Sequence, residues 1–465
     1  MVYSMAGKER DVVDTPPAAN EQPPKDVLVI GGGIAGIQAS LDLAEMGVHV
    51  HLVENSPAIG GRMAQLDKTF PTNDCSTCIL SPKMVECDRH PNVTIHALSE
   101  VQSMVGEAGD FTVRVLKRAR YVDERACTAC GDCADVCPVV RRDEFQLGLS
   151  TRRAISIPFA QAIPQAYVRD PDDCLGDEPM ACGRCIEACS RGCIDFDMRD
   201  EVVDLSVASI VVAVGMETFD PAPLTEYGYT RYENVITSLE FERLVCASGP
   251  SGGQLIRLTD RREPKVIGFI QCVGSRNLKY QRFCSSVCCM HATKEAVLAR
   301  EHLPDVRSYI FYTDLRASGR GFREYIERAR REYDVDYVRS RVAQIKEDED
   351  GKLVFHYEDP ATSRPREMRV DLAVLATSLL PGSSVAALAE VLGLELDAYG
   401  FFETDPFSPT DTTREGVYVC GCCRAPVDIP QAVAQASGAA ARAAQHVRER
   451  APARMQGLQA TGDGR

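Results

Sequence analysis

The alternation of apolar and polar residues predicts a strand, a glycine turn, a helix and a second strand near the start of the chain. Residues 26–30 form a short β-branched run, and Ile37, Leu41 and Ala44 recur at helical spacing. A second strand then closes at Glu54. This order is typical of a dinucleotide-binding unit in an α/β protein.

Three later apolar segments extend this pattern. Residues 207–215 and 371–378 read as strands that end in small residues, and they look like the crossover strands between two dinucleotide-binding subdomains. Residues 416–445 predict a strand followed by a helix of small residues. Pro430 falls in the first turn of that helix, where its missing N–H costs nothing.

Composition and charge exclude several classes of protein. Apolar residues make up 45% and charged residues 26% of the chain, as in a soluble globular protein. The formal net charge of −15 gives no reason to expect nucleic acid or an anionic membrane as partner. Residues 1–24 lack the apolar core of a signal peptide and predict a disordered leader, and no run of eighteen apolar residues could form a transmembrane segment. With no export signal, the twenty cysteines predict a cytoplasmic protein that binds metal.

Eight cysteines form two adjacent runs. The first run has the spacing of a bacterial ferredoxin with two [4Fe–4S] clusters and is followed by proline. The second has a longer first gap and is followed by Ser190. The runs are Cys127-x2-Cys130-x2-Cys133-x3-Cys137 and Cys174-x7-Cys182-x2-Cys185-x3-Cys189.

The last cysteine of each run should reach the cluster of the other run. We therefore expect one cluster on Cys127, Cys130, Cys133 and Cys189, and a second on Cys174, Cys182, Cys185 and Cys137. Cys193, four residues beyond Cys189, could replace a ligand. Zinc knuckles and disulfides are the alternatives, but zinc sites rarely combine this spacing with a following proline.

The first glycine turn carries the fingerprint of a site for FAD. Gly31 permits the tight turn, Gly33 lets the backbone approach a pyrophosphate, and Gly36 lets helix and strand pack closely. Glu54 stands where a carboxylate can hold the adenosine ribose. A purely structural glycine turn is the alternative.

Two further segments favour FAD over a nicotinamide cofactor at this site. Gly60, Gly61 and Arg62 follow Glu54 in the order found in flavoproteins of the glutathione-reductase type. In the C-terminal segment the expected FAD contacts are Gly421, Pro430 and Gln431. The usual Gly-Asp pair of this motif is Gly421-Cys422 here, so the ribityl contact of the aspartate must be met otherwise.

A second glycine fingerprint for NAD(P) is missing after the strand near residue 270. Instead, four cysteines gather around the start of a predicted helix. Buried packing cysteines are one interpretation; a third [4Fe–4S] cluster is the one we favour. The expected ligands are Cys272, Cys284, Cys288 and Cys289.

Five separated motifs together resemble the A-subunit family of heterodisulfide reductases. They are VIGGGIAGIQAS, IGGRMAQLDKTFPTNDCSTCILSPKMVE, YVDERACTACGDCADVCPV, FIQCVGSRN with CSSVCCMHATKEA, and VYVCGCCRAPVDIPQAVAQAS. The resemblance covers about residues 25–447. It implies a thioredoxin/glutathione-reductase-like fold with two dinucleotide-binding domains and an inserted bacterial-type 2[4Fe–4S] ferredoxin domain.

The domain boundaries expected from the motifs divide the chain into seven segments. They are a leader (1–24), the first portion of the FAD domain (25–120), the inserted ferredoxin (121–200), an FAD return segment (201–250), an NAD-domain-like subdomain with clustered cysteines (251–365), the second portion of the FAD domain (366–447) and a tail (448–465).

The resemblance implies an FAD- and iron–sulfur-containing electron-transfer subunit of an oxidoreductase complex. Its implied partners are heterodisulfide reductase B/C-like, hydrogenase or dehydrogenase subunits and ferredoxin, with the chain as a dimer within the complex. Flavin-based electron bifurcation, which is assigned to the methanogen members of the family, is a further hypothesis for this chain. A self-contained NAD(P)H-dependent disulfide reductase and a passive electron-wire scaffold are the rival functions.

Cys75 and Cys78 form a C-x-x-C pair whose role as redox dithiol, cluster ligands or structural thiols stays open.

Overall fold

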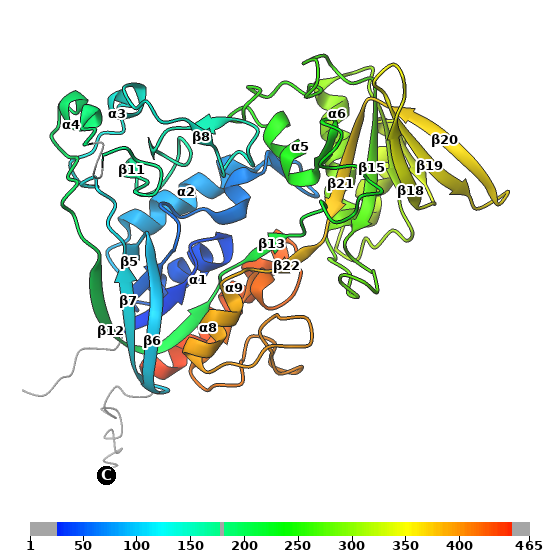
Figure 1. Ribbon diagram of the computed structural model, residues 1–465. Coiled ribbons are helices and arrows are strands. Elements are labelled where there is room, and N and C mark those ends of the chain that lie inside the picture. Colours follow the sequence, from blue (N-terminus) through cyan, green and yellow to red (C-terminus); the bar gives the residue numbers. More distant parts are fainter. Residues whose placement is uncertain (1–25, 177–180, 449–465) are drawn as a thin grey trace, which may run out of the picture.

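The computed structural model describes residues 26–176 and 181–448. The predicted leader (1–24) and all but the first residue of the predicted tail (448–465) therefore lie outside the described residues. The chain forms two α/β units joined by a narrow pair of crossing segments (Figure 1). No helix within the described ranges is long and apolar enough to cross a membrane.

The first unit is built on a seven-stranded sheet that has both parallel and antiparallel strands. Its order is β5-β2-β1-β12-β7-β6, with β23 paired to β12. β12 pairs in parallel with β1 and β23 through its second half, and antiparallel with β7 through its first half. The bounds are β1 Asp26–Ile30, β2 Val50–Val53, β5 Val93–His96, β6 Ser99–Glu107, β7 Asp110–Lys117, β12 Glu201–Val212 and β23 Val417–Val419.

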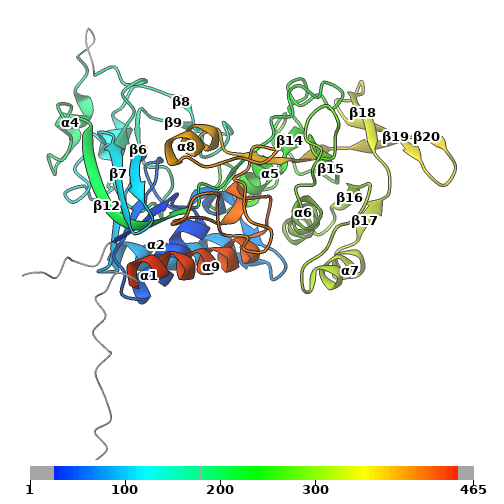
Figure 2. The same cartoon turned by 90° about the horizontal axis from the view of Figure 1, so that it is seen from below.

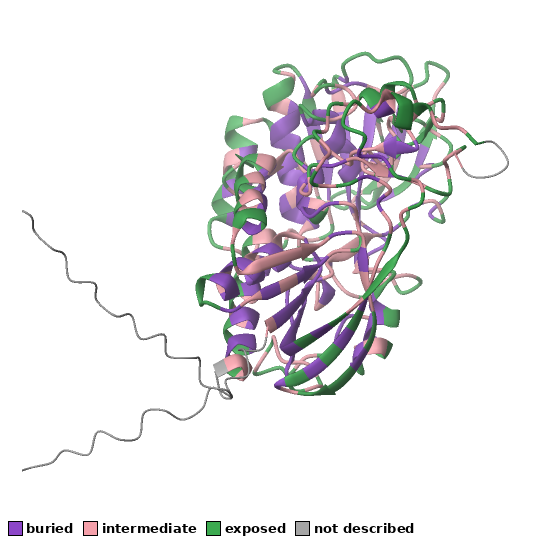
Figure 3. Cartoon of the chain, turned by 90° about the vertical axis from the view of Figure 1, so that its left-hand side faces the viewer, coloured by how far each residue is buried: buried purple, intermediate pink, exposed green. Residues whose placement is uncertain are grey.

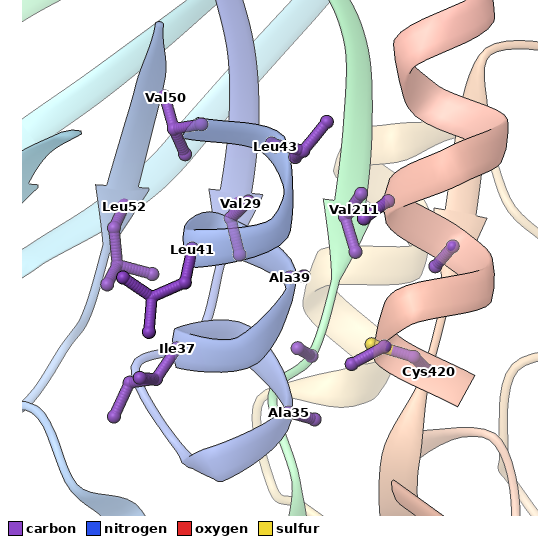
Figure 4. Packing of buried hydrophobic residues seen from close by; sticks show 14 of the residues in the cluster. Val29, Ala35, Ile37, Ala39, Leu41, Leu43, Val50, Leu52, Val211 and Cys420 are labelled. Atoms are coloured by element: carbon purple, nitrogen blue, oxygen red, sulfur yellow. The ribbon is translucent and has the colours of Figure 1, made fainter. Parts of the chain in front are cut away.

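Helices cover this sheet. α1 (Ile34–Glu45) packs against α9 (Ile429–Arg448), and the two helices lie side by side in Figure 2. Alanine side chains on α9 allow the close approach. α1 sends Ile37, Leu41 and Leu43 into the core beneath β1, β2 and β12 (Figure 4). Further elements of this unit are η1 Gly61–Gln65, β3 Lys68–Thr69, β4 Asp74–Cys75, α2 Ser76–Arg89, α8 Val385–Leu392 and η2 Gly421–Cys423.

The second unit has a parallel sheet of five strands in the order β14-β21-β15-β16-β17. A three-stranded antiparallel sheet packs beside it, with Phe311 against Phe355 at the contact. The bounds are β14 Val235–Thr237, α5 Ser238–Val245, β15 Val266–Val273, α6 Cys288–His302, β16 Arg307–Phe311, α7 Phe322–Glu332, β17 Val335–Val338, β18 Val342–Glu347, β19 Leu353–Asp359, β20 Arg364–Val370 and β21 Leu372–Thr377.

Two further segments complete the architecture. β13 (Met216–Thr218) and β22 (Leu379–Pro381) pair antiparallel and form the crossing between the units. The segment between β7 and β12 holds the ferredoxin-like cysteines and has short elements. They are α3 Asp132–Asp135, β8 Arg141–Arg142, β9 Thr151–Arg152, β10 Ile155–Ser156, β11 Val168–Arg169 and α4 Arg184–Ala188.

Burial follows the amphipathic pattern of the elements. Buried residues face the sheets, whereas exposed residues lie on the outer faces of helices and on the outer strands (Figure 3). The predicted strands at 26–30, 207–215 and 371–378 are present as β1, the second half of β12, and β21. Pro430 is the second residue of α9, as the sequence predicted.

Candidate functional site

The glycine turn after β1 is shaped by close backbone contacts. Gly31 has a φ of +104°, and a Cβ there would lie 2.4 Å from the carbonyl oxygen of Ala213. A Cβ on Gly36 would lie 1.8 Å from the carbonyl oxygen of Gly31. Gly33 differs, because a Cβ at this position meets nothing within 4 Å. The turn therefore leaves the backbone at the start of α1 open, which suits a pyrophosphate.

Glu54 is held in place at the end of β2 by three hydrogen bonds. The backbone N–H of Gly32 donates to Glu54 Oε2 at 2.6 Å. Ser56 donates to Glu54 Oε1 from its backbone N–H at 2.8 Å and from its hydroxyl at 2.7 Å. A carboxylate has about four acceptor positions. One position therefore remains for a ribose hydroxyl.

A large cavity opens beside this turn. Its volume is about 670 Å³, and its lining comes from both units and from the cysteine-rich insertion. This volume and the open backbone at Gly33 fit a dinucleotide such as FAD. The predicted cofactor-binding residues in the lining are Gly31, Gly33, Glu54, Gly61, Arg62, Gly421 and Pro430.

Two predicted cofactor residues lie outside the cavity lining. Gly36 is a buried residue of α1 that packs against the glycine turn, the packing role that the sequence assigned to it. Gln431 is exposed, and its backbone N–H donates to Asp428 Oδ1 at 2.8 Å. Its contact with a cofactor stays a prediction.

Asp428 is a site residue that the sequence did not identify. It is buried, lines the cavity and stands at the start of α9. Since Cys422 replaces the usual aspartate of the motif, Asp428 is the carboxylate that this segment offers to the cavity. The sequence signal that could have identified Asp428 is its position immediately before a helix whose second residue is proline.

The insertion closes one side of the cavity with two phenylalanines. Phe145 and Phe159 stack with ring centroids 4.9 Å apart and an interplanar angle of 19°. Both line the cavity and pack against the core of the first unit. The carbonyl oxygen of Phe145 accepts a hydrogen bond from Gln65 Nε2 at 2.9 Å. The cysteine-rich segment is thereby fixed against the proposed flavin site.

Helix α6 of the second unit also lines the cavity. Lys294 is buried, forms an ion pair with Glu242, and donates from Nζ to the carbonyl oxygen of Lys68 at 2.8 Å. One turn away, His291 Nε2 lies 2.7 Å from Glu295 Oε1. Burial raises the pKa of Glu295 above its usual range. The cavity wall thus includes Lys294, whose charge is balanced by the carboxylate of Glu242.

Three of the four cysteines expected to hold a third cluster come together at the start of α6. Cys272, Cys288 and Cys289 pack in one small group, and Cys288 also lines the cavity. Hydrogen bonding from Cys288 lowers the pKa of Cys272 to about 6. The same donor lowers the pKa of Cys289, and the backbone N–H of Arg316 also reaches its sulfur at 3.4 Å.

Cys284 is placed apart from that group. It lies half-buried in the loop before α6, where its sulfur accepts a hydrogen bond from the backbone N–H of Ser286 at 3.4 Å. Its place as the fourth ligand of this group stays a prediction.

Four of the ferredoxin-like cysteines line one small cavity. They are Cys127, Cys130, Cys133 and Cys189, and Cys193 lines it with them, its sulfur 3.4 Å from that of Cys189. Whether Cys193 replaces a ligand stays a prediction. Among the cysteines expected to hold the second cluster, burial and the nearby Cys174 raise the pKa of Cys185, and Cys137 adds a smaller effect.

Six of the remaining cysteines fall into three kinds. Cys75 and Cys78 form an exposed disulfide at the start of α2, outside the lining of the large cavity. Cys87 and Cys246 are buried, as expected for packing residues. Cys420 and Cys422 line the cavity.

Replacing Gly33 with glutamate is expected to weaken FAD binding at least ~30-fold, or about 2 kcal/mol. The new side chain would extend into open space at the start of α1, so the fold tolerates it but a pyrophosphate meets both bulk and negative charge. Fluorescence titration of the deflavinated protein measures the change. Gly438→Ala on α9 is the control and should bind like the wild type. Equal affinity for the two variants would contradict this placement of the pyrophosphate.

Comparisons with known proteins agree with this site. The family model described as FAD dependent oxidoreductase matches residues 26–77, and the model described as pyridine nucleotide-disulphide oxidoreductase matches residues 307–443. Two solved thioredoxin reductases show the same fold. The protein from Lactococcus lactis has a TM-score of 0.51 at 16% identity, covering 91% of this chain and 99% of its own. The protein from T. acidophilum has a TM-score of 0.51 at 14% identity, covering 90% and 98%.

Curated relatives are more similar in sequence. The chain is 49% identical over 421 residues to one of the iron–sulfur A-subunits (number 2) of the CoB--CoM heterodisulfide reductase of Methanopyrus kandleri. It is 48% identical over 420 residues to the iron–sulfur A-subunit of the CoB--CoM heterodisulfide reductase of Methanocaldococcus jannaschii. Each match covers 90% of this chain and 63% of the relative. The chain thus spans less than two thirds of the length of these relatives.

Proposed function

The chain belongs to the A-subunit family of heterodisulfide reductases, and on that premise we propose that it is an FAD- and iron–sulfur-containing electron-transfer subunit of an oxidoreductase complex. One observation carries the proposal. A single cavity is lined by the glycine turn, by the phenylalanines of the cysteine-rich insertion and by Cys288. The proposed flavin site therefore adjoins the proposed cluster site at Cys288, and it contacts the insertion that carries the other cluster cysteines through Phe145 and Phe159.

Each group of residues has a role in this function. FAD, when bound, takes up and releases electrons singly or in pairs. The glycine turn and Glu54 would hold its adenosine half, and Arg62, Asp428 and the start of α9 would surround its other half. Phe145 and Phe159 keep water from the side of the cavity that faces the insertion.

We further propose [4Fe–4S] clusters on the three cysteine groups. Thiolates are the ligands of such clusters, and the eight cysteines of the insertion follow ferredoxin-like spacing, with four of them lining one small cavity. Cys272, Cys288 and Cys289 offer three thiolates for a further cluster at the start of α6. The domain boundaries expected from the motifs belong to this proposal, since the insertion lies between β7 and β12.

The proposed function requires other chains. Relatives include the A-subunit of H(2):CoB-CoM heterodisulfide,ferredoxin reductase, from Methanothermobacter marburgensis, and an H(2)/formate counterpart from Methanococcus maripaludis. We accordingly propose heterodisulfide reductase B/C-like, hydrogenase or dehydrogenase subunits as partners. Flavin-based electron bifurcation is a narrower hypothesis, because it also needs a ferredoxin as second acceptor. The cytoplasmic location expected from the sequence stays a prediction.

Affinity purification of the full chain under anoxic conditions tests this function. We expect it to recover associated oxidoreductase subunits, and we expect the chain freed of them to bind FAD and iron but to be inert towards NADH. Oxidation of NADH by the isolated chain with a disulfide as acceptor would instead favour the self-contained NAD(P)H-dependent reductase. FAD that stays unreduced in the active complex would favour a passive scaffold.

A further inference from the structure

A cluster of imidazole and carboxylate groups lies at the end of the first sheet opposite the cavity. Asp26 is the first residue of β1, and His49 and His51 stand at the start of β2. The cavity is lined by the other ends of the same strands, at Ile30 and Val53. The cluster is therefore separate from the proposed flavin and iron–sulfur sites.

The three side chains converge on one point. Asp26 Oδ2 is 2.9 Å from His49 Nδ1 and 3.0 Å from His51 Nε2. One ligand atom from each residue lies within 4.8 Å of the other two. A zinc ion bonds these atoms at roughly 2.0–2.2 Å, which requires separations of roughly 3.3 Å between them. The two Asp26–histidine separations are within a few tenths of an ångström of that value.

The outer nitrogen of each imidazole has a partner, as in metal sites where the second ring nitrogen orients the ligand. His49 Nε2 lies 3.1 Å from Thr94 Oγ1, and His51 Nδ1 lies 3.1 Å from His96 Nε2. Thr94 and His96 both belong to the adjacent strand β5. Two neighbouring strands thus fix the rings of His49 and His51 with the inner nitrogens directed at Asp26.

The cluster is also open to solvent on one side. Side-chain exposures of 30% for Asp26 and 34% for His49 let water complete the coordination.

We propose that Asp26, His49 and His51 bind one divalent transition-metal ion of the zinc class, joining the start of β1 to β2. Two nitrogens and one carboxylate oxygen, with room for water, form a borderline donor set unlike the all-thiolate cluster sites. The other such group, Glu242 with His291 and Glu295, is a weaker candidate because Lys294 already neutralises Glu242. The proposal does not depend on the proposed redox function.

The test uses the full chain loaded with FAD and iron, so that the cluster cysteines are occupied. The protein is first treated with EDTA under conditions that leave its iron content unchanged. Zn²⁺ is then added to each variant, and its binding is measured by calorimetry and by metal analysis. We expect one Zn²⁺ per chain in the wild type. His51→Gln and the isosteric Asp26→Asn should each weaken this binding at least ~100-fold. His96→Ala should weaken it ~10–100-fold, as partners of metal-bound histidines do.

His356→Ala is the matched control, because His356 lies on β19 beside Glu367 in the second unit. It should bind Zn²⁺ like the wild type. Zn²⁺ should also raise the melting temperature of the wild type and of this control, but not of His51→Gln. No Zn²⁺ on the wild type would overturn the proposal. Equal binding by His51→Gln and Asp26→Asn would assign the ion to other groups and would overturn it as well.

Discussion

Replacing Lys294 with methionine is expected to lower the free energy of unfolding by about 3–5 kcal/mol, because it leaves the carboxylate of Glu242 buried without its partner. The side chains of Lys294 and Glu242 are 3% and 0% exposed. Glu242 also accepts a hydrogen bond from the backbone N–H of Asp67 at 3.0 Å, which holds it between the two units. Urea titration of the reconstituted protein measures the change.

Two companion variants separate this ion pair from general disruption. Glu242→Gln combined with Lys294→Met should recover most of the lost stability, because removing both charges removes the uncompensated one. Lys68→Met breaks the more exposed pair with Glu301, at 2.7 Å and 30% exposure on each side, and should cost about 1 kcal/mol or less. Similar losses for Lys68→Met and Lys294→Met would show that burial of the pair is not what matters.

Much of the fold could be predicted because its signals are local. The turn after β1 requires glycine at Gly31 and Gly36, and the sequence displays that requirement directly. The length of β12 could not be predicted in the same way. Its first half, from Glu201, is largely exposed and mixes apolar with polar residues, so no continuous apolar run marks it. That half is a strand because it pairs with β7, which lies 90 residues earlier at the Arg114–Asp204 contact.

The site was predictable where one motif supplies it and not where distant segments meet. Phe145 reaches the cavity through contacts to Gln65, 80 residues away, and no spacing rule links the two. Lys294 likewise meets Lys68 across 226 residues. Gln431 and Cys284 show a second limit: each stands next to site residues in the sequence, yet Gln431 is exposed and Cys284 lies in the loop before α6, so their roles as ligands stay predictions.

Cys288→Ala is expected to lower the iron content of reconstituted protein from about twelve atoms to about eight per chain, while FAD stays bound. Cys288 is 4% exposed and links Cys272 to Cys289 at the start of α6, so its loss removes the central thiolate of that group. The start of a helix also favours the negative charge of thiolates by about 0.3–1 kcal/mol each. Iron analysis and the flavin absorbance give the two readouts.

Cys246→Ala is the matched control, because Cys246 is buried but contacts Ser248 instead of other cysteines. It should keep the iron content of the wild type.

Cys284→Ala distinguishes two arrangements of the third cluster. Loss of about four irons would mean that Cys284, in the loop before α6, is one of the cluster ligands. A wild-type content near eight irons, unchanged in Cys288→Ala, would assign Cys272, Cys288 and Cys289 to packing or dithiol chemistry. Electrons would then have to pass between the flavin site and partner chains through the insertion, where Phe145 and Phe159 adjoin the cavity.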